Sequence, residues 1–298
     1  MNKFPFISII TVNYRQTTAT LEFLEACSRF QYPDFEVIIV DNDPLENLEI
    51  PENILRDRYQ YIVSQENPGF AAANNLGISK ASGDYYFFLN NDTIPTPELL
   101  QICVQTFLDN PSIGGLSPMI LYADQKETIQ YAGYTPISPW TGRNNSPGKG
   151  QKIQDRFLKP GPTAYLHGAA MMVRRDVVEK AGRIPEMYFL YYEELDWSVR
   201  ILDKGYQIFF QPQARVYHKA SLSVGNDSVL KAYYYHRNRI LFMRRNTRGF
   251  SFVFFSFYTA LVILPKYSLR FMITGKWKHL RAFWRGMVWH INNKTRHN

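Results

Sequence analysis

The sequence predicts an α/β fold in which helices flank a mostly parallel sheet. Apolar, β-branched runs alternate with helical segments through the first ninety residues, and polar residues follow directly after those runs. This alternation is typical of βαβ units, which build parallel sheets covered by helices. Ligands of such sheets bind beyond the carboxyl ends of the strands, so those polar residues are the first candidates for a functional site.

The expected elements follow one another along the chain. In the first half we expect strands at 6–12, 35–40, 59–63 and 85–89, with helices at 17–29 and 70–82. The next helix should have Thr96 as its N-cap and Pro97 at its first position. In the second half we expect strands at 167–173, 207–210 and 214–217, with helices that begin at Asp176 and Glu193 and end before Gly182 and Gly205.

A long loop separates the two halves. Residues 136–162 are rich in Pro, Gly, Asn and Lys, and Trp140 is their isolated large aromatic. A loop of this length in a compact enzyme is typically a lid or a binding loop, or else disordered. We therefore take Trp140 as a candidate on the acceptor side of a site.

Charge divides the chain near residue 227. Residues 228–298 contain fourteen Lys or Arg and no Asp or Glu, whereas the first 227 residues carry 20 basic and 26 acidic residues. We expect a catalytic domain at 1–227 and a basic, aromatic-rich helical extension at 228–298. A basic segment of this kind favours an anionic partner surface, either a membrane or a nucleic acid.

Two helices are expected in the extension. The apolar run 250–264 is followed by Pro265 and Lys266, and fifteen helical residues reach only about 22 Å, short of a hydrocarbon core of about 30 Å. We expect that run not to span a membrane. The second helix, at 276–291, has one apolar face and one basic face: Trp277, Leu280, Trp284, Met287, Val288 and Ile291 oppose Lys276, Lys278, Arg281 and Arg285. This pattern predicts a helix lying on anionic lipid, and the alternative is a helix whose apolar stripe packs on the catalytic domain.

Acidic and polar residues at strand ends are the candidate site. Asp41 can accept the N3–H of uracil or thymine, although an Asp there also forms turns unaided. Asp92, in Asn90-Asn91-Asp92, suits Mg²⁺ or Mn²⁺ held with diphosphate oxygens, and the alternative is an ordinary turn. His218 taken alone is more typical of a structural imidazole.

Three carboxylates begin the helix at 193. Acids at a helix start stabilise it through the helix dipole. However, Glu193 and Glu194 are adjacent and repel each other, which raises the pKa of one toward useful base strength. Asp196 is the third candidate. None of these signals decides the function by itself.

Eight short motifs occur in one order, and together they resemble the inverting family 2 glycosyltransferases with the GT-A fold, particularly bacterial rhamnosyltransferase-like members. The resemblance covers about residues 6–245. The motifs are Ile9-Ile-Thr-Val-Asn-Tyr14, Val40-Asp-Asn42, Asn67-Pro-Gly-Phe-Ala-Ala-Ala-Asn-Asn-Leu-Gly77, Leu89-Asn-Asn-Asp-Thr93, Gly168-Ala-Ala-Met-Met-Val-Arg-Arg175, Tyr191-Tyr-Glu-Glu-Leu-Asp-Trp197, Val216-Tyr-His218 and Tyr234-Tyr-His-Arg-Asn238.

The resemblance implies a role for each candidate residue. Residues that bind the donor are Thr11, Asn13 and Asp41 around the nucleobase and Asn67, Gly69, Asn74, Asn90 and Asn91 along the ribose, sugar and diphosphate. Asp92 and His218 would hold Mg²⁺ or Mn²⁺, and Glu194 would be the catalytic base. Trp140, Glu193 and Asp196 are acceptor-side candidates. The sequence departs from the family pattern at Asn90, where an Asp is usual, and at Glu194, where the base is usually Asp; Glu193 and Asp196 therefore remain alternatives for the base.

The predicted function is metal-dependent, inverting sugar transfer. The favoured donor is dTDP-L-rhamnose, and the acceptor is a hydroxyl of a lipid-linked cell-surface polysaccharide precursor. We expect a cytoplasmic protein bound peripherally to the inner face of a bacterial plasma membrane. The alternatives are another donor, such as a UDP-hexose or UDP-galactofuranose, or a non-catalytic protein that binds nucleotide or nucleic acid. No nucleic-acid motif is recognisable, so we expect no nucleic-acid partner, and no Gly-x-Gly-x-x-Gly follows the first strand, which disfavours a dinucleotide-dependent oxidoreductase.

Overall fold

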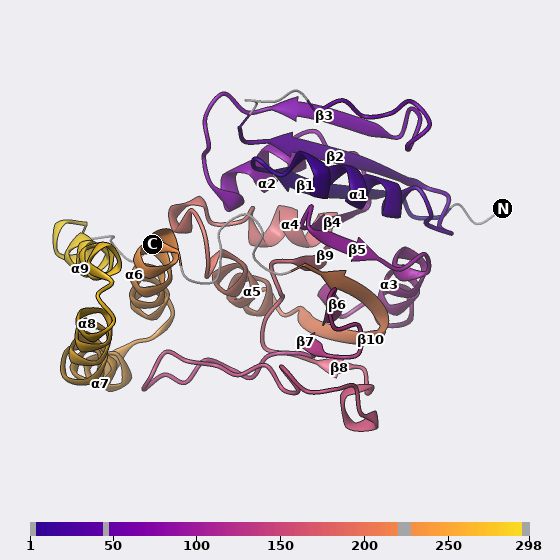
Figure 1. The fold of residues 1–298 in the computed structure, drawn as a ribbon. Helices are drawn as coiled ribbons and strands as arrows, with labels where there is room; N and C mark the ends of the chain where they lie inside the picture. The colour runs from indigo at the N-terminus through magenta and orange to yellow at the C-terminus, as the bar shows by residue number, and fades with distance from the viewer. Residues whose placement is uncertain (1–3, 44–47, 220–227, 294–298) are drawn as a thin grey trace.

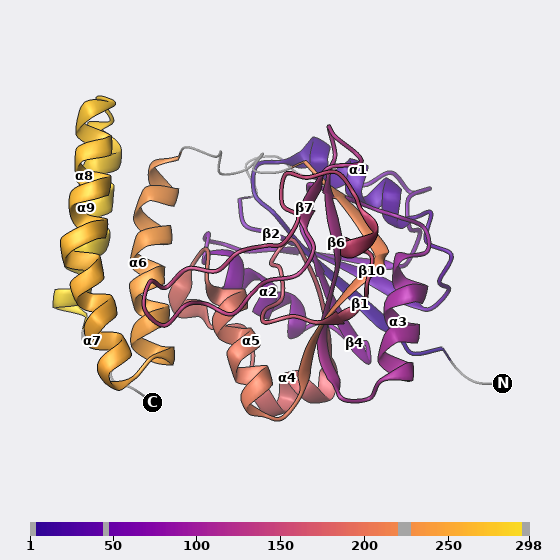
Figure 2. The ribbon, with the colours of Figure 1, turned by 90° about the horizontal axis from the view of Figure 1, so that it is seen from below.

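A ten-stranded sheet crosses the molecule, and a group of helices lies along one side of it (Figures 1 and 2). The structure, a computed structural model, describes residues 4–43, 48–219 and 228–293. Its strands are β1 (Ile7–Asn13), β2 (Phe35–Asp41), β3 (Tyr59–Val63), β4 (Tyr85–Leu89), β5 (Thr93–Pro95), β6 (Ile113–Tyr122), β7 (Ile129–Tyr131), β8 (Gly161–Pro162), β9 (Ala170–Arg174) and β10 (Gln207–His218).

The strand order confirms the predicted fold class. It runs β3-β2-β1-β4-β9-β6-β10-β5, with β7 beside β6 and β8 beside β10. The first four strands are parallel, β9 is antiparallel to both of its neighbours, and β6 is again parallel to β10. The carboxyl ends of β1, β2 and β4 therefore meet at one edge.

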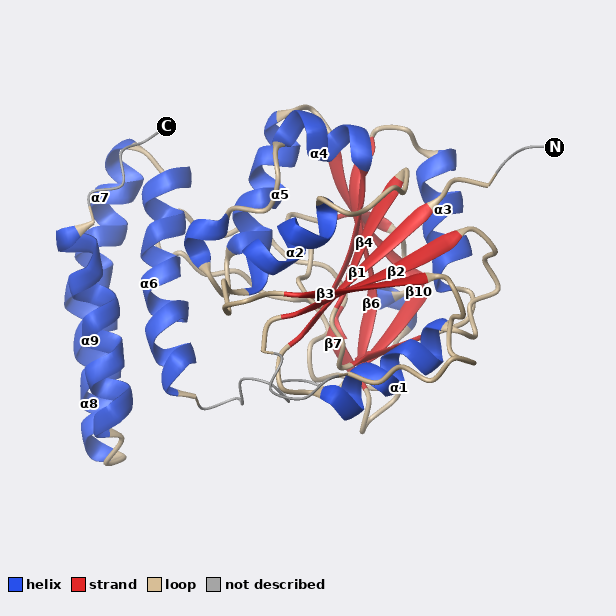
Figure 3. Ribbon diagram, turned by 90° about the horizontal axis from the view of Figure 1, so that it is seen from above, coloured by secondary structure: helices blue, strands red, loops and turns tan. Residues whose placement is uncertain are grey.

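Helices cover both faces of this sheet (Figure 3). The described helices are α1 (Thr17–Cys27), α2 (Phe70–Ile78), α3 (Leu99–Asp109), α4 (Arg175–Ala181), α5 (Glu193–Asp203), α6 (Val229–Asn246), α7 (Gly249–Tyr258), α8 (Leu264–Ile273) and α9 (Trp277–Asn292). The sheet is covered by α1 to α5, and α6 to α9 lie to one side of it (Figure 3). Successive strand residues point to opposite faces. Ile9 thus packs in the cluster that includes α1 and α3, while Ile10 packs in the cluster that includes α2, α4 and α5.

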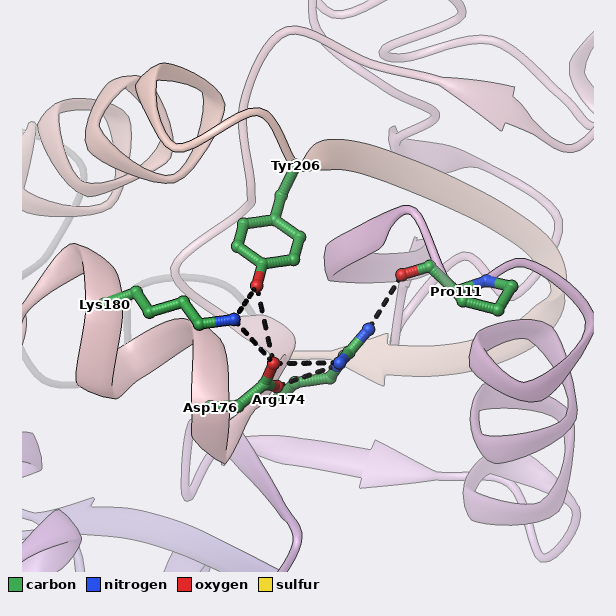
Figure 4. Close-up of polar contacts among 5 residues, drawn as sticks. All are labelled: Pro111, Arg174, Asp176, Lys180 and Tyr206. Carbon is green, nitrogen blue, oxygen red and sulfur yellow. Dashed lines mark hydrogen bonds and ion pairs between the residues drawn. The ribbon is translucent and has the colours of Figure 1, made fainter.

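Ion pairs and hydrogen bonds tie together the edge opposite those carboxyl ends (Figure 4). Arg174, at the end of β9, holds Asp176 through two 2.9 Å hydrogen bonds and donates a third to the carbonyl oxygen of Pro111, before β6. Lys180 of α4 donates to the hydroxyl of Tyr206, before β10. Salt bridges therefore brace the amino ends of β6 and β10, away from the candidate site residues.

Two local expectations were wrong. The helix α3 begins at Leu99 rather than after Thr96, because the amide of Thr96 still donates to Arg215 of β10 and continues the sheet edge. The two strands expected around 207–217 are one strand, β10, which pairs with β6 on both sides of a register shift between Gln211 and Arg215. Pro212 cannot donate to the ladder, and a bulge accommodates it.

The apolar run in the extension is longer than expected. Residues 249–273 form one helix of 25 residues, in which a π turn at Thr259–Ile263 joins α7 to α8. Pro265 falls in the first turn of α8, where the missing N–H is tolerated, so it does not break the helix. Within the described chain, this is the one helix long and apolar enough to cross a membrane, by length and composition alone. The expectation that it is too short is therefore wrong.

The helices of the extension also contact the rest of the protein. Leu241, Phe242 and Met243 of α6 share a core cluster with Tyr188 and Leu195. On its other side α6 packs along α9, where Gly286 allows close approach: a Cβ there would lie 2.9 Å from the carbonyl oxygen of Tyr233. The division at residue 227 stays a prediction, but α6 is packed on the body and on the extension alike.

Candidate functional site

A buried polar network joins the carboxyl ends of β1, β2 and β4. Asn13 lies opposite Asp41 in the parallel register, and its Nδ2 donates to Asp41 Oδ2 at 3.0 Å. The Oδ1 of Asn13 accepts from Thr20 Oγ1 of α1 at 3.0 Å and from Asn91 Nδ2, after β4, at 3.4 Å. The structure therefore brings three of the predicted site residues together at the edge where a parallel sheet binds ligands.

Asp41 is held from three sides. It is 0% exposed, and its carboxylate accepts from the amide of Asp43 at 3.0 Å, from Asn13, and from the hydroxyl of Tyr61 at 2.7 Å. A carboxylate has about four lone-pair sites, so one is left for a ligand. Burial and the bond to Asp41 raise the pKa of Tyr61 to about 12, so its hydroxyl donates at neutral pH. The sequence did not reveal Tyr61 as a site residue, because a tyrosine within a strand is typical of the hydrophobic core. Nearby on β1, the buried Oγ1 of Thr11 has no partner within the described residues.

The Asn67-Pro-Gly69 motif contacts the loop that leads to the glutamates. Asn67 is exposed, and its Oδ1 accepts from the amide of Gly69 at 3.0 Å. Gly69 has φ +89°, and a Cβ there would lie 2.6 Å from the carbonyl oxygen of Phe189, so only glycine fits. Asn74 is buried, and its Nδ2 donates to the carbonyl oxygen of Phe70 within α2. Asn90 is half-buried, and its amide donates to the carbonyl oxygen of Ala169.

Asp92 and His218 form a buried pair. Asp92 Oδ1 lies 3.0 Å from His218 Nε2, but neither atom has a hydrogen-bond partner of good geometry within the described chain. The other ring nitrogen, Nδ1, lies 2.9 Å from Oε1 of Gln130 on β7. A neutral imidazole that donates from Nδ1 presents a lone pair at Nε2. Sequence reasoning missed Gln130, since nothing nearby marks a lone glutamine as an orienting group.

This pair fits a divalent cation. Two electron-pair donors face each other there, and Gln130 orients the imidazole as outer groups do in metal sites. No cluster of three or more His, Cys, Asp or Glu side chains that could hold a metal occurs in the described ranges. Two protein ligands suit Mg²⁺ or Mn²⁺ that takes its remaining oxygens from a diphosphate and water.

Glu193 and Glu194 begin α5 after a strained loop. Phe189, Tyr191 and Tyr192 have φ values of 64°, 70° and 76°, a region that residues with side chains rarely adopt. Burial raises the pKa of Glu194 to about 7. Burial and the charge of Glu194 raise the pKa of Glu193 further. One oxygen of each carboxylate, Oε2, has no hydrogen-bond partner in the described part of the chain.

The helix α6 holds this loop in place. Asn238 is fully buried, and its Nδ2 contacts the carbonyl oxygens of Tyr188, Leu190 and Tyr191 at 2.7 to 2.8 Å. Arg237 donates to the carbonyl oxygens of Met187 and Tyr188 at 2.9 and 2.8 Å. These bonds supply donors to the loop's carbonyl oxygens, of which that of Tyr188 also accepts from the amide of Leu190.

The remaining acceptor-side candidates make packing contacts. Asp196 is buried, pairs with Arg245 at 3.3 Å and accepts from Asn246 Nδ2 at 2.7 Å, which ties α5 to α6. The indole of Trp140 makes edge contacts with Phe250 and Phe254 of α7. The long loop therefore reaches the extension at Trp140.

Residues 8–182, more than half of the chain, match the family described as glycosyl transferase family 2. The chain belongs to this family. Glycosyltransferase AglE of Haloferax volcanii is 26% identical over 211 residues, which cover 69% of this chain and 64% of AglE. The N-acetylglucosaminyl-diphospho-decaprenol L-rhamnosyltransferase of Mycobacterium tuberculosis is 21% identical over 271 residues, which cover 82% of this chain and 85% of that protein. The chain spans only 28% and 16% of the length of two other curated relatives.

Solved structures agree on the fold. The mannosyltransferase PcManGT from Pyrobaculum calidifontis, in complex with GDP-Man and Mn²⁺, aligns with a TM-score of 0.58 at 14% identity. The alignment covers 99% of this chain and 77% of that one. At this identity the likeness concerns the fold alone, and it confirms the GT-A fold of this family 2 member.

We predict that Asn238→Ala loosens the loop before α5. It removes the side-chain donor to the carbonyl oxygens of Leu190 and Tyr191 and one of several donors to that of Tyr188. Each lost bond contributes about 0.5–1.5 kcal/mol. The melting temperature should fall, and hydrogen exchange at residues 188–192 should rise more than elsewhere. The matched control is Asn293→Ala, at the exposed end of α9. Unchanged exchange at 188–192 would contradict the role given to Asn238.

We predict that the stability gained by Glu194→Gln depends on pH. Between pH 4.5 and about 7, Glu194 keeps its proton in the folded protein because its pKa is raised there, whereas in the unfolded chain it loses the proton. The free energy of unfolding of the wild type therefore falls as the pH rises through this window. The variant should match the wild type at pH 4.5 and exceed it above pH 7, by on the order of 3 kcal/mol at most. Urea unfolding at both pH values measures the difference, with Glu179→Gln on exposed α4 as the control for a lost carboxylate. A gain that does not grow with pH refutes the buried-carboxylate assignment.

Proposed function

We propose that this protein is an inverting glycosyltransferase of glycan or polysaccharide biosynthesis. It moves a sugar from a nucleoside diphosphate to an acceptor hydroxyl. The observation that carries the proposal is the arrangement of two groups beyond the sheet edge: a buried Asp92–His218 pair fit for a cation, and the half-buried Glu194, whose Oε2 is buried and whose pKa is raised to about 7. Family membership and the names of the glycosyltransferase relatives support the same reaction class.

Residues at the carboxyl ends of the strands bind the nucleotide-sugar donor on the side of the leaving diphosphate. Asp41 has one acceptor site left, which suits a nucleobase N–H, and the hydroxyl of Thr11, two residues before Asn13 on β1, has no partner within the described residues. Asp92 and His218 would hold the divalent ion. When bound, that ion neutralises the charge that develops on the departing diphosphate.

Glu194 is the base on the other side. It accepts the proton of the acceptor hydroxyl, whose oxygen bonds to the anomeric carbon as the bond from that carbon to the diphosphate oxygen breaks. The nucleoside diphosphate leaves with the electron pair, and configuration inverts. A pKa of about 7 suits a base that works near neutral pH. Glu193 is less suited because its pKa is raised further, and the carboxylate of Asp196 is engaged by Arg245 and Asn246.

The proposed donor is dTDP-L-rhamnose and the proposed acceptor a lipid-linked glycan. The name of the Mycobacterium tuberculosis relative, an L-rhamnosyltransferase acting on a diphospho-decaprenol, supports both, at 21% identity. A UDP-hexose and UDP-galactofuranose are the competing donors.

The extension lies in the membrane plane under this proposal, on the cytoplasmic face. The helix 249–273 exposes large apolar side chains, and Leu261 is 73% exposed. Its first turns pack on the body through Phe255, and it leads into α9, whose Phe283 and Met287 are buried in a cluster shared with α6. Spanning the bilayer would separate α9 from α6. An in-plane helix keeps both contacts and presents Arg281 and Arg285 of α9 to anionic lipid.

We predict that donor cleavage needs the Asp92–His218 pair. Release of nucleoside diphosphate is measured with dTDP-L-rhamnose, UDP-glucose, UDP-galactofuranose and GDP-mannose. The rate should be highest with dTDP-L-rhamnose, fall to background in EDTA and return with Mn²⁺ or Mg²⁺. Asp92→Asn should lower it at least 100-fold, whereas Asp109→Asn, at an exposed position at the end of α3, should not. Full activity in EDTA would overturn the metal role, and release from none of the four donors would overturn the proposed function.

We predict that binding to vesicles depends on charge and on the apolar face separately. Replacing Lys278, Arg281 and Arg285 with Gln should weaken flotation with anionic vesicles and leave flotation with neutral ones unchanged, since each base near an anionic leaflet contributes about 1 kcal/mol. Leu261→Ser should weaken both. The control replaces three exposed lysines of the catalytic body, Lys126, Lys159 and Lys204, with Gln. Equal loss from the two triple variants would show that net charge, and not this surface, attaches the protein.

A further inference from the structure

His167 is a fixed imidazole that the proposed reaction has not yet used. It precedes β9, and its own amide donates to Ser117 Oγ at 3.0 Å. Its ring packs on two tyrosines that also contact each other: Tyr131, at 4.9 Å between centroids, and Tyr134, at 5.7 Å and nearly parallel. The ring is therefore held by the backbone below it and by aromatic packing around it.

The hydrogen bonds of His167 decide where its proton lies. Its Nδ1 accepts from the amide of Ala169 at 3.1 Å. A neutral ring that accepts at Nδ1 carries its hydrogen on Nε2. Burial, with smaller contributions from His218 and Lys149, lowers the pKa of His167 to about 3, so the ring stays neutral. Nε2 is then a hydrogen-bond donor, and it has no partner within the described residues. An Nε2 that keeps its hydrogen cannot bind a metal ion or act as a base.

His167 has neighbours in both halves of the site, the Asp92–His218 half and the Glu194 half. On one side, Tyr131, which packs on the ring, adjoins Gln130, whose Oε1 lies 2.9 Å from His218 Nδ1. On the other, Gly168 adjoins Glu194: a Cβ on that glycine would lie 3.8 Å from Glu194 Cδ. Tyr134 stacks on the ring. In an inverting transfer the sugar occupies the space between the leaving diphosphate and the base, and the neighbours of His167 belong to both sides of that space.

We propose that His167 contacts the transferred sugar and donates its Nε2 hydrogen to one sugar hydroxyl. This inference rests on the proposed function and deepens it, because it names a residue that selects the donor. The contact is specific: a donor-only group recognises an oxygen acceptor, and a site built to bond a hydroxyl strongly disfavours the analogue that lacks it.

Two substitutions separate the hydrogen bond from the packing. His167→Phe keeps an aromatic ring packed on Tyr131 and Tyr134 but removes the donor. His167→Gln places an amide N–H near the position of Nε2. We measure kcat and KM with the donor that the wild type uses best and with its monodeoxy analogues, together with the Kd of the free nucleoside diphosphate.

We expect His167→Phe to lower kcat/KM for the donor at least tenfold, and His167→Gln to recover most of that loss. The Kd of the nucleoside diphosphate should stay within twofold of the wild-type value. With the wild type, one deoxy analogue should have a kcat/KM lower than that of the donor by the same factor. With His167→Phe, that analogue and the donor should have equal kcat/KM, because the variant already lacks the hydrogen bond.

Three results would overturn the proposal. They are wild-type kcat/KM in His167→Phe, an equal loss with every deoxy analogue, and a loss of nucleoside diphosphate affinity as large as the loss with the sugar donor. If the wild type binds neither nucleotide sugar nor nucleoside diphosphate, the proposed function fails and the inference fails with it. If the wild type transfers sugar and His167→Phe is unchanged, the inference alone fails.

Discussion

The candidate site depends on how α6 holds the loop from Met187 to Tyr192. Three residues of that loop have positive φ, each at a cost of roughly 1–3 kcal/mol in backbone strain. Asn238 and Arg237 offset the strain by satisfying the buried carbonyl groups of the loop, and the amide of Phe70 donates to Phe189 from the donor side. Because the loop contacts Gly69 on one side and begins α5 on the other, this clamp sets the distance between the donor motif and the glutamates.

The same helix connects the site to the extension. Its apolar residues join the core beside Tyr188 and Leu195, while its other face packs along α9. The composition of α6 assigns it to the basic extension, but α6 contacts both the extension and the body of the protein. If the extension lies on a membrane, α6 therefore holds the glutamates at a constant height and orientation above it. This arrangement would suit an acceptor whose reactive hydroxyl is held close to the lipid surface.

Sequence patterns predicted the parts of the fold that local chemistry determines. Buried runs of β-branched or aromatic residues located β1, β2 and β4, and the polar residues after them lie at one edge as expected. The strand β6 was not predicted, because Gly114, Gly115 and Pro118 obscure its pattern and only pairing with β9 and β10 makes it a strand. The uninterrupted helix through Pro265 was also missed, because the π turn at Thr259–Ile263 that precedes the proline has no sequence signal of its own. Within the site, Tyr61, Gln130 and His167 are distant in sequence from the groups they contact, so no local motif marks them.

The central claim is that Glu194 removes the acceptor proton while the diphosphate leaves from the opposite face of the sugar. Proton NMR of the first-formed glycosidic product, with a donor of known anomeric configuration, tests it most directly. The account predicts an anomeric configuration opposite to that of the donor, with no covalent sugar adduct detected by mass spectrometry of the protein. A product that retains the donor configuration would contradict the assignment of Glu194 as the base and the single-displacement reaction with it.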